Sequence, residues 1–138
     1  MFTGEHERLL DEKGRLSLPP VFRRQLVESA FLARSDSAPC LLLFSPEEIQ
    51  RVADRLKERV LNGEVSVDQQ RRWGASITEV KTDAQGRLAI PPKLRQLGGL
   101  EREVVLIGVI DRAEIWDADA WAEVERATDE DVNEGMWL

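Results

Sequence analysis

One stretch of the sequence, DEKGRLSLPPVFR at residues 11–23, occurs a second time as DAQGRLAIPPKLR at residues 83–95. The two copies are identical at seven of thirteen positions and are separated by an offset of 72 residues. The same offset aligns residues 40–44 with residues 112–116, and both runs end in an aromatic side chain. Self-similarity at a fixed offset indicates a repeated structural unit. The chain is therefore a tandem duplication of one supersecondary unit.

Each copy contains a turn, a short strand and a pair of prolines in the same order. Asp11 and Gly14 predict a tight turn, because aspartate bonds the backbone two residues on and glycine accepts a positive φ. The alternation of polar and apolar residues after the turn predicts the returning strand of a hairpin. Pro19 and Pro20 lack the amide hydrogen that a strand needs, so the strand ends there and a short helix begins.

Hydrophobic periodicity and capping signals predict the remaining elements of an α+β fold. Ser45-Pro46-Glu47-Glu48 predicts a capping box at the start of a long helix. The predicted strands cover residues 5–10, 15–18, 30–34, 40–44, 76–82, 87–90, 104–110 and 113–116. The predicted helices begin at Pro20 and cover 46–61, 67–75, 92–97 and 118–126. We expect four segments: a first unit at 1–61, a helical connector at 62–75, a second unit at 76–127 and an acidic C-terminal tail at 128–138.

The size and composition of the chain fit one compact domain. With 138 residues, of which 42% are apolar, the two units are expected to share one core. The single cysteine, Cys40, excludes an intrachain disulfide and a multi-thiolate zinc site, and its apolar surroundings predict a buried, reduced thiol. No stretch resembles a signal peptide or approaches the roughly 20 apolar residues that span a bilayer. We therefore expect a cytoplasmic protein without a membrane partner.

The negative net charge is concentrated at the C-terminal end of the chain. The protein has a net charge of −7, and residues 111–138 carry ten acidic side chains against two arginines, a net of −8. Residues 1–110 therefore carry +1, and the segments 11–24 and 83–95 carry +2 each. The duplicated motifs are thus locally basic, which keeps nucleic acid open as a partner.

Catalytic chemistry has little support in the sequence. His6 is the only histidine, and no serine or cysteine stands beside a motif-positioned base. No glycine-rich phosphate loop and no cluster of metal ligands is present in the sequence. We interpret His6 as a surface residue of a strand. We expect a protein that is not an enzyme, with no cofactor, no metal and no small-molecule substrate.

The repeated Asp-x-x-Gly-Arg turn allows a structural and a functional interpretation, which are compatible. In the first, aspartate closes the turn and its arginine braces the hairpin. In the second, each hairpin tip presents cations, because the planar arginine fork suits phosphate oxygens and the guanine edge, and a β-ribbon can enter the major groove. The expected cations are Lys13, Arg15, Arg23 and Arg24 in the first hairpin, and Arg87, Lys93 and Arg95 in the second.

These motifs resemble those of the MraZ family of bacterial regulators, whose members carry paired Asp-x-x-x-Arg signatures in a duplicated AbrB-like (SpoVT-AbrB) domain. The signatures are Asp11 with Arg15 and Asp83 with Arg87. The resemblance covers essentially the whole chain. It includes Phe2-x-Gly4, the run LLLFSP at 41–46, and Val109 followed by Glu114-Ile115-Trp116.

The resemblance implies an architecture and a function. Two swapped-hairpin units would interlock about a pseudo-twofold axis into one compact β-barrel-like body with short helices. The protein would assemble into a cyclic homo-oligomer that presents its signature loops to double-stranded DNA. It would bind short direct repeats upstream of the division and cell-wall gene cluster, usually as a repressor, and associate with the nucleoid.

Carried over to this sequence, the resemblance implies DNA contacts by Arg15 and Arg87, followed by Lys13. Asp11 and Asp83, with Gly14 and Gly86, would orient the arginines. Gln85 stands where the first turn has Lys13, so the two loops are expected to contribute unequally. The alternative function is a protein-interaction module of the AbrB or antitoxin type, whose acidic tail captures a basic partner.

Overall fold

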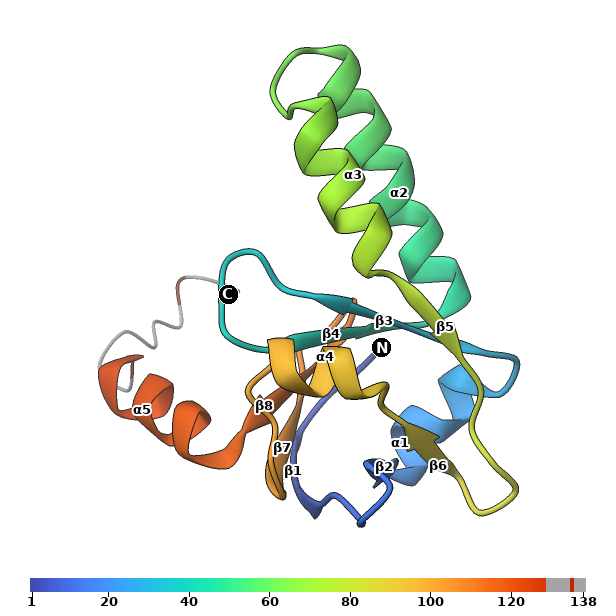
Figure 1. Ribbon diagram of the computed structural model, residues 1–138, viewed down its shortest axis with the longest axis vertical. Coiled ribbons are helices and arrows are strands. Elements are labelled where there is room, and N and C mark those ends of the chain that lie inside the picture. The colour runs from blue at the N-terminus through green and yellow to red at the C-terminus, as the bar shows by residue number, and fades with distance from the viewer. Residues whose placement is uncertain (129–134, 136–138) are drawn as a thin grey trace.

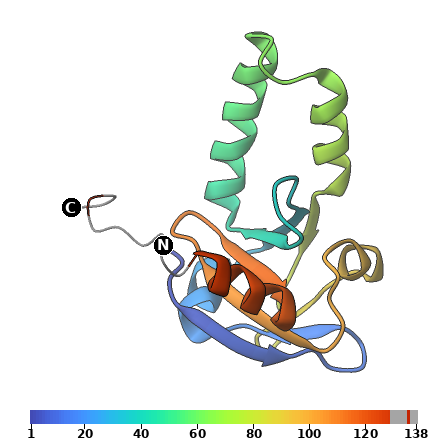
Figure 2. The same cartoon turned by 90° about the vertical axis from the view of Figure 1, so that its left-hand side faces the viewer.

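The computed structural model describes residues 1–128 and Gly135 as one α+β body with a helical arm (Figures 1 and 2). Its six-stranded antiparallel sheet follows the order β1-β7-β8-β4-β3-β5, and β2 and β6 form a separate antiparallel pair. In chain order the strands are β1 (Glu5–Leu9), β2 (Arg15–Ser17), β3 (Ala30–Arg34), β4 (Leu41–Phe44), β5 (Thr78–Val80), β6 (Arg87–Ala89), β7 (Glu103–Gly108) and β8 (Ala113–Asp117).

The two sequence repeats exchange strands. The first strand of the first repeat, β1, pairs with β7 of the second, and β5 of the second repeat pairs with β3 of the first. The central strands β4 and β8 join the two halves, and β2 pairs with β6. The predicted α+β fold of interlocked, swapped-hairpin units is therefore confirmed. Closure into a barrel stays a prediction, because the strand order runs from an edge at β1 to an edge at β5.

Short helices follow the proline pairs, and longer helices follow the central strands. The helices are α1 (Pro20–Arg23), which continues as a 3-10 turn η1 (Arg24–Leu26), α2 (Pro46–Leu61), α3 (Val67–Ser76), α4 (Pro92–Leu97) and α5 (Ala118–Thr128). Proline stands in the first turn of α1, α2 and α4, where its missing amide hydrogen costs no helical bond. Among the described residues, none of these helices has the length and apolar character of a bilayer-spanning segment.

The capping of the long helices differs from the prediction in one detail. Ser45 accepts a hydrogen bond from the Glu48 amide as expected, at 3.3 Å, but the Glu48 carboxylate pairs with Arg51. The complete capping box lies at α3, where the Ser66 and Gln69 side chains each accept the other residue's amide, at 3.0 and 2.9 Å. A nearby guanidinium on α2 offers the Glu48 carboxylate a charge-assisted bond in place of the backbone amide.

Helices α2 and α3 run side by side away from the sheet as an arm (Figures 1 and 2). The apolar residues of α2 are at most half-buried, and no α2 or α3 residue is fully buried. At the far end of the arm, Leu61 is 86% exposed. An amphipathic two-helix layer without a third partner leaves much of its apolar stripe in contact with water. The arm lies at the opposite end of the molecule from the turn that joins β1 to β2 (Figure 1).

Two strands, β5 and β7, differ from the sequence prediction by more than one residue at an end. The connector helix α3 extends to Ser76, so β5 is confined to the three residues that pair with β3. Strand β7 ends at Gly108, and Ile110 has a φ of +71°, a left-handed conformation that the turn into β8 imposes. Ile110 still forms a bridge with Phe2 of the N-terminal segment. Hydrophobic periodicity does not reveal where a chain must turn with positive φ.

The core contains side chains from both repeats. One of them is Phe22 of α1, which packs against the N-terminal segment. Phe22 is fully buried, and the rings of Phe2 and His6 pack edge-on against it with centroid distances of 5.2 and 5.1 Å. Edge-to-face packing is favourable between aromatic rings. His6 lies in β1, as predicted, and is half-buried. Its ring takes part in the packing of the N-terminal segment.

Cys40 is buried as predicted, and its chemistry leads to a first test. Burial, with the nearby Glu114 carboxylate, raises the pKa of the Cys40 thiol to about 12. At pH 8, well below this pKa, the thiolate fraction is on the order of 10⁻⁴. Only the thiolate is the nucleophile, so the folded protein reacts slowly. We expect native protein to react with a thiol reagent far more slowly than urea-unfolded protein. Equal rates in the two states would contradict the burial of this thiol.

Candidate nucleic-acid interface

The first signature loop is built around the carboxylate of Asp11. Its Oδ1 accepts hydrogen bonds from the backbone amides of Lys13 at 2.9 Å and Arg15 at 2.8 Å. Its Oδ2 accepts a bond from the Nε of Arg15 at 2.5 Å. Gly14 has a φ of +73° and donates its amide to the Asp11 carbonyl. One short acidic side chain therefore fixes both the turn and the direction of the arginine that follows it.

The second loop reproduces the same geometry. Asp83 accepts from the backbone amides of Gln85 and Arg87, each at 2.9 Å, and from the Nε of Arg87 at 2.9 Å. Gly86 has a φ of +75°. Identical residues at the aspartate, glycine and arginine positions thus give one structure twice. The pairing of aspartate with arginine that the sequence indicated is present in both loops.

The environment of both aspartates favours their charged form. Hydrogen bonds from the following arginine's backbone amide, its side chain and a second amide hold the pKa of Asp11 and of Asp83 below the usual aspartate value. Because their pKa is lower in the folded state, the ionised aspartates stabilise the fold at pH values above the ordinary aspartate pKa. That contribution is lost as the pH falls through the lowered value. Both ion pairs are therefore fully formed at neutral pH.

The pairing of β2 with β6 brings the two arginines onto one surface. Ser17 lies opposite Arg87 across this pair, and Arg15 lies opposite Ala89. The Nη1 of Arg87 also reaches the carboxylate of the other loop, at 3.9 Å from Oδ2 of Asp11. About a third of each arginine side chain is exposed. A guanidinium has five N–H donors, and the described pairings leave several of them for acceptors outside the chain.

Lys13 and Gln85 occupy equivalent, exposed positions within the two turns. Their backbone amides bond the aspartates, while their side chains differ in charge. The two halves of this surface therefore share one backbone. The first turn has Glu12 and Lys13 where the second has the uncharged Ala84 and Gln85, so the two turns differ in where charges lie and have the same net charge.

The structure corrects the placement of two other motif residues. We expected Arg23 to belong to the first hairpin and Arg95 to the second. Because the units exchange strands, Arg23 instead lies against Gly86 of the second loop, and Arg95 lies against Gly14 of the first. The Nη2 of Arg23 donates to the carbonyl of Ala84 at 3.2 Å. Identity at the last motif position was the sequence signal for these arginines, but it did not identify the loop that each one contacts.

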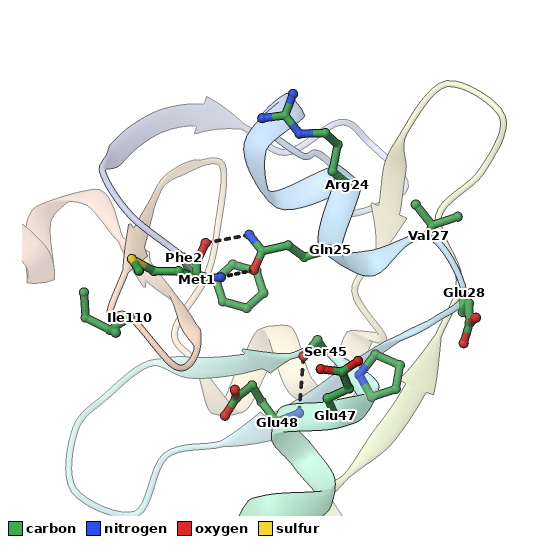
Figure 3. A pocket seen from close by; sticks show the side chains of 11 residues that line it. Met1, Phe2, Arg24, Gln25, Val27, Glu28, Ser45, Glu47, Glu48 and Ile110 are labelled. Atoms are coloured by element: carbon green, nitrogen blue, oxygen red, sulfur yellow. Dashed lines mark hydrogen bonds between the residues drawn. The ribbon is translucent and has the colours of Figure 1, made fainter.

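A hollow of about 460 Å³ lies away from the loops, between the N-terminus, η1 and the start of α2 (Figure 3). The amide of Gln25 accepts from the Met1 ammonium group and donates to the Met1 carbonyl, each at 2.6 Å. Ser45 is the one serine among the described residues of the lining, and it accepts from the Glu48 amide as a helix cap (Figure 3). These polar groups hold the N-terminal residue and cap α2, and no described contact among them pairs a nucleophile with a base.

Comparisons with known proteins identify the family. The model of the family described as "MraZ protein, putative antitoxin-like" matches residues 1–72 and 75–135. A protein of Paenarthrobacter aurescens named transcriptional regulator MraZ is 42% identical over 89% of this chain and 85% of its own length. Proteins of the same name from Kocuria rhizophila and Micrococcus luteus are 40% and 39% identical over 99% of this chain and their full length. This chain belongs to the MraZ family.

Proposed function

We propose that this chain is a sequence-specific DNA-binding transcriptional regulator that acts as a repressor. It would bind short direct repeats upstream of the division and cell-wall gene cluster. The main support is the pair of signature loops, whose aspartates hold Arg15 and Arg87 on one face of the β2–β6 pair. The names of its relatives, transcriptional regulators, point to the same class of function.

The loops provide a chemical basis for reading DNA. Arginine forms two parallel hydrogen bonds with the O6 and N7 atoms of guanine and also binds phosphate. Asp11 and Asp83 limit the rotamers of their arginines, so less side-chain entropy is lost on binding. Lys13 adds a cation that suits phosphate as a point charge. Lys13 thus gives the first loop a phosphate ligand that Gln85 does not give the second.

Affinity would come from several loops acting together. One protomer offers few cations, whereas a cyclic homo-oligomer places many loops near successive repeats at high effective concentration. Apolar side chains on separate segments support self-association: Leu61 is 86%, Val27 74% and Ile110 61% exposed. Head-to-tail contacts between unlike surfaces close into rings when the rotation allows.

We further propose four functional segments and a location. Residues 1–61 and 76–127 form the two AbrB-like units, residues 62–75 the helical connector, and residues 128–138 an acidic tail. A regulator with these loops would act in the cytoplasm, associated with the nucleoid. The part of the tail at 129–134 and 136–138 lies outside the described residues.

Titration of labelled DNA tests the proposal. Fluorescence anisotropy would compare a fragment from upstream of the protein's own gene, the same fragment with one repeat left, and scrambled DNA, at two salt concentrations. We expect tight binding to the intact fragment, weaker binding to one repeat, and an affinity that falls steeply with salt because phosphate contacts release counterions. Equal, weak binding to all three DNAs would reject a sequence-specific regulator.

The alternative function, capture of a basic partner by the acidic tail, has one specific observation in its favour. The description of the matching family ends in "antitoxin-like". Deleting residues 128–138 separates the two functions. A loop-based DNA reader would keep its DNA affinity without the tail, whereas an interaction module would lose its partner.

A further inference from the structure

Each signature glycine is covered by an arginine from the other repeat. A Cβ atom at Gly14 would lie 2.5 Å from the Cζ of Arg95 and 2.6 Å from its Nε and Nη1. A Cβ at Gly86 would lie 2.6 Å from the Cζ and Nε of Arg23 and 2.7 Å from its Nη1. In each case Cζ, Nε and Nη1 lie at nearly equal distances from the Cβ position. That position therefore lies over the flat face of the guanidinium. The flat side of each arginine therefore rests on the glycine backbone.

We propose that Arg23 and Arg95 are positioning residues that brace the signature loop of the opposite repeat. They would act on DNA recognition through the loops, by fixing the backbone that carries Arg87 and Arg15. The effect on DNA rests on the function proposed above. The brace itself is a property of the protein alone.

The brace explains why this motif combines glycine with arginine. Only glycine lets another group approach its Cα so closely, and each glycine also supplies the positive φ of the turn. The guanidinium is planar and weakly hydrated, so it can stack on a peptide with little loss of solvation. A lysine ammonium carries a similar charge but has no flat face to stack. The last residue of the motif is therefore expected to require arginine for its shape.

Other contacts between the repeats hold the same loops. The carbonyl of Gly86 accepts the amide of Leu18 at 3.1 Å, and the carbonyl of Gly14 accepts the amide of Ile90 at 3.0 Å. Arg23 adds its bond to Ala84. Each loop thus rests on a strand end and an arginine that both belong to the other repeat. The two loops form one mechanically coupled unit.

The bases of both braces are anchored in the core. Arg23 follows Phe22, which is fully buried, and Arg95 follows Leu94, which is 4% exposed. Arg95 is half-buried, and its Nε is buried without a hydrogen-bond acceptor among the described residues. A buried donor without a partner requires an explanation. Stacking of the Arg95 guanidinium on Gly14 provides this explanation, because the contact through the flat face holds the side chain in place although its Nε has no acceptor among the described residues.

Hydrogen exchange measured by NMR in the absence of DNA tests the brace directly. We expect Arg23→Ala to accelerate exchange of the Gly86 and Arg87 amides and to leave those of Gly14 and Arg15 unchanged. Arg95→Ala should produce the reverse pattern. This crossed effect, in which a change in one repeat loosens the loop of the other, is not expected from general destabilisation. Arg24→Ala, beside Arg23 but lining the hollow of Figure 3, is the matched control and should change neither loop.

Lysine variants separate a brace from a phosphate contact. If the proposal is correct, Arg23→Lys and Arg95→Lys each lower DNA affinity about as much as alanine, roughly tenfold, with an unchanged dependence on salt. Full binding by the lysine variants, with a shallower salt dependence for the alanine variants, would instead make both residues phosphate ligands and overturn the proposal. Thermal unfolding of each variant checks that the fold is retained.

The exchange measurement does not need DNA, so failure of the brace and failure of the proposed function are distinguishable. Unchanged exchange in both loops of the alanine variants overturns the brace, whatever the DNA result. The alanine variants could show the crossed acceleration of exchange while replacement of Arg15 and Arg87 leaves DNA affinity unchanged. That result would retain the brace and reject the loops as the DNA-binding surface.

Discussion

Gly86→Ala is expected to lower the free energy of unfolding by about 2–4 kcal/mol, and to weaken DNA binding through the same loop. An alanine at a φ of +75° has a strain of about 1–2 kcal/mol, as for other left-handed residues. Its Cβ would also lie 2.6 Å from the Cζ of Arg23, so the guanidinium must leave its position. Overpacking of this kind costs about 1–3 kcal/mol, which is partly relieved when the side chain moves toward solvent. Urea denaturation monitored by tryptophan fluorescence measures the loss.

Gly63→Ala is the matched control for this prediction. Gly63 has a φ of +77°, but a Cβ there would meet no atom within 4 Å. Its replacement therefore reports the backbone strain alone, and we expect about 1–2 kcal/mol. The difference between the two variants isolates the contact with Arg23.

A double-mutant cycle makes the same comparison within one loop. In an Arg23→Ala background the side chain that opposes the new Cβ is absent. Gly86→Ala should then cost no more than Gly63→Ala, and the interaction energy of the cycle should be about 1 kcal/mol or more. Equal costs of Gly86→Ala in both backgrounds would show that the arginine does not cover the glycine.

The sequence predicted most elements because their limits are set by local chemistry. Helix α2 was predicted at 46–61 and observed at Pro46–Leu61, since proline defines its first turn and Asn62-Gly63 ends it. The turns of both signature loops follow from aspartate and glycine at fixed spacing. Local signals of this kind do not depend on which strand becomes the partner.

Pairing between the repeats could not be derived in the same way. Duplicated strands bury the same side chains whether they pair within a repeat or across it, so periodicity favours neither arrangement. The resemblance to a known family, and not the residue pattern, predicted the exchange. The contacts of Arg23 and Arg95 depend on it, which is why their placement from sequence was wrong. Residues that act across an exchange of strands are recognised only when the partner strand is known.

Replacement of both signature arginines, Arg15→Ala with Arg87→Ala, is expected to lower affinity for the upstream fragment by a factor of about 30 to 10⁴. Loss of a bidentate contact to a base costs about 1–3 kcal/mol, and each engaged protomer would lose two. The carboxylates of Asp11 and Asp83 would then face DNA without their partners, which adds repulsion at low salt. Anisotropy at two salt concentrations measures the change, and light scattering confirms that assembly is equal to wild type.

Arg126→Ala is the matched control, because it removes one arginine from α5, where the side chain is 70% exposed and pairs with Glu123. It should bind DNA as wild type does. Unaltered affinity in the double variant, with assembly intact, would exclude the loops as the DNA-binding surface.

Lysine at the same two positions separates general attraction to DNA from sequence recognition. Arg15→Lys with Arg87→Lys keeps both charges, so contacts with phosphate persist as point-charge interactions. It removes the planar fork that matches the O6 and N7 atoms of guanine. We therefore expect this variant to retain binding to scrambled DNA and to lose most of its preference for the repeats. If the preference survives, specificity arises from sequence-dependent DNA shape or from other side chains, and the signature arginines act mainly through charge.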